Sequence, residues 1–116
     1  KVVEEELNKL NDIIVKEIEV HGIKARGFKG KDKFLAARKK KGKKDLGFVG
    51  EVIGFNRSML NSIISEAIPV VCPMGVSGDD VKFNINADEV AFFLASQLSA
   101  EKVVFLTNVL GVMRDP

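Results

Sequence analysis

Residues 81–106 read VKFNINADEVAFFLASQLSAEKVVFL, and this stretch shows how strands and helices alternate along the chain. Apolar residues recur after Asn86 at helical spacing, which predicts an amphipathic helix with the face Ala87, Val90, Ala91, Leu94, Ala95 and Leu98. Asn86 is a favoured capping residue, and Glu89 follows it in capping-box position. The flanking segments 81–85 and 102–106 read as short strands, and the second is apolar enough to be buried on both faces.

The segments upstream continue this alternation of helices and strands. Helical spacing predicts helices over 3–21, with an apolar face of Leu7, Leu10, Ile14 and Ile18, and over 56–67, with Leu60, Ile63, Ile64 and Ala67. Short strands are predicted over 24–28 and 69–74, and a strand or a hairpin broken by glycines over 45–54. We therefore predict an α/β fold with three αβα layers around a mainly parallel sheet.

Composition limits the possible classes of protein. The 116 residues are 46% apolar and 29% charged, which suits one globular domain. The net charge of +2 indicates no class of partner. The sequence contains no apolar run of 18 residues, so we expect no membrane-spanning helix. We expect no secretory signal either. The single Cys72 cannot form an internal disulfide, and no Cys/His cluster suggests zinc, so we expect a reducing, cytoplasmic compartment.

Charge is concentrated in one window of the chain. Residues 24–44 contain eleven Lys or Arg residues and one acid, Asp32, for a net charge of about +10. Such a window could bind a nucleic-acid backbone, and its Gly27-x-x-Gly30 spacing faintly resembles the glycine loop of KH domains. Only Phe28 and Phe34 are interleaved with the basic residues, and the chain has no Trp or Tyr. A solvated basic loop is therefore the preferred interpretation.

The candidate site lies where strands end and a helix begins. Ligands of open parallel sheets collect at the carboxyl ends of the strands, here the loops 75–78 and 107–113. The amide of Asn84 could donate to a substrate carboxylate, and Asp88 could hold lysine ammonium groups near a transferred phosphate. A helix N-terminus also favours anions. Structural roles remain open for each: Asn86 as a cap, Asp88 as a dipole-stabilising acid, and Thr107-Asn108 as a plain turn.

Four motifs occur in one order along the chain: DLGFVGEV at 45–52, PVV at 69–71, FNINAD at 83–88 and EKVVFLTNVLGV at 101–112. Together they resemble the amino-acid kinase family, and within it most closely the acetylglutamate kinase branch. The resemblance implies transfer of the ATP γ-phosphoryl group to the side-chain carboxylate of N-acetylglutamate, a step of arginine biosynthesis. The implied cofactors are ATP and the Mg²⁺ bound with it.

The resemblance also implies roles for individual residues. Asn84 would bind the amino-acid portion of the substrate, and Asp88 would orient catalytic lysines. The nucleotide site would include, largely through backbone groups, Asn108, Val109, Leu110, Gly111, Val112 and Met113. Position 108 is usually Asp in the family and is Asn in this chain.

Several family features have no counterpart in this sequence. Two Gly-Gly loops, an arginine and two lysines of such kinases are missing, so we expect a central piece of a longer enzyme, inactive alone. Residues 1–67 would end the substrate lobe region, and residues 68–116 would form the substrate site and begin the nucleotide lobe.

The resemblance further implies a homo-oligomer in the cytoplasm or a plastid, with a trimeric nitrogen-signalling protein as a regulatory partner. A membrane partner is not expected. Two alternatives remain open. The first is another amino-acid kinase, such as an aspartate kinase. The second is a non-catalytic module for nucleotide or nucleic-acid binding or for assembly.

Overall fold

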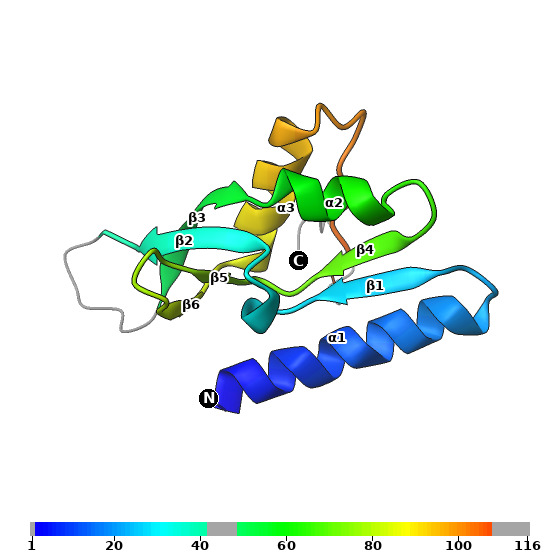
Figure 1. Ribbon diagram of the computed structural model, residues 1–116, viewed down its shortest axis with the longest axis horizontal. Coiled ribbons are helices and arrows are strands. Elements are labelled where there is room, and N and C mark those ends of the chain that lie inside the picture. The colour runs from blue at the N-terminus through cyan, green and yellow to red at the C-terminus, as the bar shows by residue number, and fades with distance from the viewer. Residues whose placement is uncertain (1, 42–48, 108–116) are drawn as a thin grey trace, which may run out of the picture.

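The computed structural model describes residues 2–41 and 49–107 (Figure 1). Its elements follow in chain order: α1 (Val2–Val20), β1 (Ala25–Phe28), the 3₁₀ helix η1 (Gly30–Asp32), β2 (Leu35–Lys39), β3 (Gly50–Phe55), α2 (Arg57–Ile63), β4 (Ile68–Val71), β5 (Met74–Val76), β6 (Lys82–Asn84) and α3 (Ala87–Gln97). Helices and strands are mixed along the chain, so the predicted α/β class is confirmed.

The described strands form two sheets. β1 pairs with β4 in parallel, and the second sheet has the order β3-β2-β5-β6. Within it β2 and β5 are parallel, whereas β2 with β3 and β5 with β6 are antiparallel. The second sheet therefore contains more antiparallel pairing than the mainly parallel sheet that the sequence predicts. The antiparallel β5–β6 pair follows from its short turn, because a parallel pair needs a long crossover connection.

Helices cover both faces of the β1–β4 sheet. A Cβ on Gly27 would meet Asn11 and Val15 of α1, so this residue faces α1. The next residue, Phe28, is 1% exposed and packs in the core with Leu60 of α2. Successive strand residues point to opposite faces, so α1 and α2 lie on opposite sides of this sheet, as Figure 1 shows.

The hydrophobic core lies on the α2 side and extends to α3. Phe28 and Phe34 stack with ring centroids 4.4 Å apart. The buried core comprises Phe28, Phe34, Leu35, Ala37, Leu60, Ile63, Phe83, Ile85 and Val90. Cys72 is also buried, and burial raises the pKa of its thiol, as is typical of a structural, unreactive cysteine.

The helix over 3–21 is confirmed as α1, and Leu7 and Ile18 of its predicted face are partly buried, but the most buried side of the helix differs from the prediction. Leu10 and Ile14 are 52% and 39% exposed, while Asn11 is 3% exposed. The Asn11 amide donates to the Val70 carbonyl at 3.0 Å. Because Gly27 has no side chain, α1 approaches β1 closely along the Asn11 side of the helix.

Two predicted strands differ in the structure. The strand over 69–74 is divided into β4 and β5 by Cys72 and Pro73, where Met74 N donates to the Cys72 carbonyl at 2.7 Å. The segment 102–106 is exposed and forms no strand with any described residue. Predicted strand residues 45–48 lie outside the described residues.

Among the described residues, no helix is both long and apolar enough to cross a membrane.

Candidate functional site

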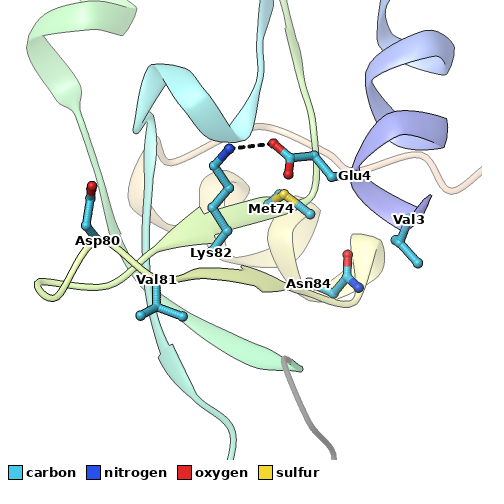
Figure 2. Close-up of a pocket in the computed structure, with 7 residues that line it drawn as sticks. All are labelled: Val3, Glu4, Met74, Asp80, Val81, Lys82 and Asn84. Atoms are coloured by element: carbon cyan, nitrogen blue, oxygen red, sulfur yellow. Dashed lines mark hydrogen bonds and ion pairs between the residues drawn. The ribbon is translucent and has the colours of Figure 1, made fainter. Parts of the chain in front are cut away.

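A cavity of about 340 Å³ opens between the start of α1 and the β5–β6 hairpin. Figure 2 shows the residues that line it: Val3, Glu4, Met74, Asp80, Val81, Lys82 and Asn84. The wall combines apolar side chains with one lysine, one amide and two carboxylates. Such a mixture suits a small polar ligand with an apolar portion.

Strand alternation places the two donor side chains of β6 on one face. Phe83 is 7% exposed and belongs to the core. Its neighbours Lys82 and Asn84 must point the other way, and both line the cavity. The hairpin turn fixes this strand, since Ser77 N donates to the Val81 carbonyl at 2.9 Å.

The charged groups at the cavity are paired. The Lys82 ammonium lies 2.6 Å from a Glu4 carboxylate oxygen, with side chains 39% and 24% exposed (Figure 2). The Asp80 carboxylate forms an ion pair with the Lys33 ammonium, whose nitrogen lies 2.9 Å from Asp80 Oδ1. Both of these residues have positive φ, 67° and 56°, so the pair joins two left-handed turns. The cavity therefore presents an ammonium group already bound to a carboxylate.

The start of α3 lies directly after Asn84, and the side chain of Asn86 caps this helix. Asn86 Oδ1 accepts from the backbone N–H groups of Asp88 at 2.9 Å and Glu89 at 3.2 Å. The capping role of Asn86 is confirmed. The expectation that these N–H groups bind an anion is wrong for Asp88 and Glu89, because the Asn86 side chain already occupies both.

A lysine does reach the first turn of α3, although not at the expected residue. Lys40 Nζ lies 2.9 Å from Glu89 Oε2, and both side chains are about half-buried. Asp88 is exposed and is not one of the residues that line the cavity. The structure thus places Asn84 in the cavity and Asp88 at the adjacent helix start.

The remaining predicted site residues, 108–113, lie outside the described residues. Sequence reasoning missed Glu4 and Lys82. The alternation of β6 could have placed Lys82 on the face of Asn84. No sequence signal joins Glu4 to a lysine 78 residues away.

Comparisons with known proteins bear on the whole chain. Acetylglutamate kinase of Desulforamulus reducens is 44% identical over 119 residues, covering 99% of this chain and 42% of that protein. Acetylglutamate kinase of Clostridium beijerinckii is 45% identical over 111 residues, covering 93% of this chain and 39% of that protein. The chain therefore spans about two fifths of the length of these relatives.

A solved structure and a family model agree with these relatives. The crystal structure of smu.665 from Streptococcus mutans UA159 matches with a TM-score of 0.75 and 27% identity, over 86% of this chain and 41% of that chain. The amino acid kinase family model matches residues 1–116. With its strands, helices and motifs in the order described above, the chain belongs to the amino acid kinase family.

Proposed function

We propose that the protein phosphorylates the side-chain carboxylate of N-acetylglutamate with ATP, as a step of arginine biosynthesis. One observation carries the proposal: Asn84 faces a cavity of about 340 Å³ and lies immediately before the α3 turn that bears Asp88. The named relatives, which are acetylglutamate kinases, support this choice of substrate.

The chemistry needs positioning and charge neutralisation rather than a covalent intermediate. A carboxylate oxygen of N-acetylglutamate bonds to the γ-phosphorus of ATP, and the bond to the β–γ bridging oxygen breaks, so that ADP leaves. Asn84 holds the amino-acid portion of the substrate in the cavity. Asp88 orients ammonium groups that neutralise the transferred phosphoryl group.

The nucleotide is assigned to residues 108–113, as the family resemblance implies. A Mg²⁺ ion held mainly by nucleotide phosphates needs only one or two protein carboxylates. Asp88 is assigned to the ammonium groups, and the Glu89 carboxylate already pairs with Lys40, so the Mg²⁺ ion is assigned to the phosphates of the nucleotide.

The organisation of the whole protein is part of the same proposal. Residues 1–67 form the end of the substrate lobe region, and residues 68–116 provide the substrate site and the start of the nucleotide lobe. We also propose a homo-oligomer in the cytoplasm that a nitrogen-signalling trimer regulates. Activity requires the remaining family elements, because the chain spans 42% of its Desulforamulus relative.

Nucleic-acid binding is less well supported. Basic side chains of the window 24–41 pair with acids from distant segments, including Lys29 with Asp12 at 2.7 Å and Lys40 with Glu89 at 2.9 Å. These pairs reduce the positive charge available to a phosphate backbone.

The test replaces Asn84 with Ala in the full-length protein and measures ATP-dependent phosphorylation. The KM for N-acetyl-L-glutamate should rise about tenfold or more, because the amide loses its hydrogen bond to a charged substrate. The matched control is Asn61→Ala, an exposed amide on α2. An unchanged KM for Asn84→Ala would remove the residue from the site.

The same assay separates the substrate from its nearest alternative. Phosphorylation of L-aspartate in preference to N-acetyl-L-glutamate would replace the proposed reaction with that of an aspartate kinase.

A further inference from the structure

We propose that Lys40 is a positioning residue of the reaction: it neutralises the Glu89 carboxylate, so that the catalytic ammonium groups collect at Asp88 beside it. The inference rests on the proposed function and adds to it the selection of one carboxylate out of two at the start of α3. It is carried by the ion pair between Lys40 and Glu89, in which Lys40 Nζ lies 2.9 Å from Glu89 Oε2.

The first turn of α3 presents two neighbouring carboxylates. Asp88 and Glu89 are consecutive residues, so their Cα atoms lie about 3.8 Å apart. Their backbone N–H groups donate to the same acceptor, Asn86 Oδ1. Carboxylates this close attract the same cations, so an ammonium group that approaches Asp88 is also drawn to Glu89 unless another charge compensates Glu89.

Lys40 supplies the compensating charge from another element. It follows the end of β2, where its backbone N–H donates to the Val49 carbonyl at 3.0 Å. Val49 in turn forms a parallel bridge with Asn84, just before α3. The backbone of the lysine is therefore anchored beside the segment that leads into α3. Among the ion pairs between described residues, Glu89 takes part in this one and Asp88 in none.

Exposure also distinguishes the two carboxylates. The side chains of Lys40 and Glu89 are 40% and 37% exposed, so their pair is partly shielded from solvent. Asp88 is exposed. An ammonium group from another part of the protein therefore reaches Asp88 without displacing a resident cation, whereas it must displace Lys40 to reach Glu89.

The helix start does not depend on this ion pair. The Asn86 side chain already accepts from two backbone N–H groups of the first turn. Val90, the next residue after Glu89, is 5% exposed and packs in the core. Loss of the Lys40 charge should thus leave α3 in place and act through the freed Glu89 carboxylate, which would compete with Asp88 for the ammonium groups.

The experiment measures steady-state kinetics of N-acetyl-L-glutamate phosphorylation in the full-length protein. Lys40→Met should lower kcat about fivefold, which is the scale of a partly exposed ion pair. The KM for N-acetyl-L-glutamate should stay within about twofold, because neither residue of the pair is assigned to the substrate. Glu89→Gln should keep kcat within about twofold, because an amide does not compete for ammonium groups.

The double variant Lys40→Met/Glu89→Gln separates this role from a structural one. It should recover kcat to within about twofold of the unsubstituted protein, because no charge at position 89 remains to be neutralised. Two controls should also keep kcat within about twofold. Lys40→Arg retains the positive charge, and Lys41→Met removes that of the neighbouring exposed lysine.

The inference is overturned if the double variant is as slow as Lys40→Met, or if Lys40→Met is as fast as the unsubstituted protein. Equal losses in Lys40→Met and Glu89→Gln would also overturn it, because the pair would then only join β2 to α3. Thermal unfolding of each variant, measured in parallel, identifies any variant that has lost its fold. The proposed function fails in a different way: the unsubstituted protein itself would not phosphorylate N-acetyl-L-glutamate.

Discussion

At the scale of the single residue, Asp88 is fixed in position by a hydrogen bond of its backbone, not of its side chain. Its N–H donates to Asn86 Oδ1 at 2.9 Å, while its carboxylate is exposed at the start of α3. A substitution of the side chain should therefore leave the helix start in place. This arrangement makes Asp88 a suitable position for separating catalysis from folding.

We predict that Asp88→Asn in the full-length protein lowers kcat by about two orders of magnitude or more. The amide keeps the shape of the side chain but no longer attracts the ammonium groups that, in the proposed reaction, neutralise the transferred phosphoryl group. The KM for N-acetyl-L-glutamate should change little. Steady-state kinetics test this, with Asp79→Asn in the exposed hairpin turn as the control. A kcat within about twofold of normal would exclude the catalytic role.

The candidate site shows which residue roles a sequence can indicate. Asn84 and Asp88 lie in one short motif that runs from the end of β6 into α3, so local spacing predicts that they are neighbours, with Asn84 in the cavity wall and Asp88 at the helix start. Glu4 and Lys82 meet only after α1 packs beside β6, with 78 residues between them. A contact of this kind depends on tertiary packing, so no local pattern could predict it.

At the scale of the element, the start of α3 depends on Asn86. Asn86→Ala should lower the free energy of unfolding by about 1 kcal/mol, because two backbone N–H groups lose their acceptor. Chemical denaturation measures the change. Asn86→Asp keeps a capping oxygen and should retain most of the stability. Equal losses in the two variants would show that the cap contributes little.

Helix α1 shows why its extent was predicted correctly and its buried face only in part. Apolar spacing marks a helix, but the face that packs is selected by the surface beneath it. Here Gly27 leaves room for Asn11, which is 3% exposed, while Leu10 is 52% exposed. The pairing of a buried amide with a glycine on another element leaves no periodic signal.

We predict that Gly27→Ala lowers the free energy of unfolding by about 2 kcal/mol, the scale of an overpacked interface. The new Cβ would overlap Asn11 Oδ1 and would displace the amide that binds the Val70 carbonyl. Urea denaturation tests this. Gly54→Ala is the control, because among the described residues its Cβ would meet only the Ala36 Cβ, at an ordinary contact distance of 3.7 Å. Equal stabilities of the two variants would contradict the close approach of α1.

Predictions about strands failed where pairing was needed. An apolar run such as 102–106 favours a buried strand, yet a strand forms only where a partner offers hydrogen bonds. The division of 69–74 into β4 and β5 has a local cause, because Pro73 has no N–H to donate to a ladder. Composition alone thus indicated where extended segments lie but not how they pair.

At the scale of the whole molecule, remote segments supply acids that pair with three lysines of the basic window. Lys29 pairs with Asp12 of α1, and Lys33 pairs with Asp80 of the hairpin turn. Lys40 and Glu89 join the end of β2 to α3. The sequence showed the excess of positive charge in the window but not which acidic residues pair with it. These pairs lower the positive charge that the window offers to a phosphate backbone.

The most direct test of the account incubates the full-length protein with ATP, Mg²⁺ and N-acetyl-L-glutamate and traps any acyl phosphate with hydroxylamine. The account predicts that hydroxamate forms in proportion to ADP, and only when N-acetyl-L-glutamate is present. ADP without hydroxamate, or hydroxamate formed from L-aspartate but not from N-acetyl-L-glutamate, would contradict it.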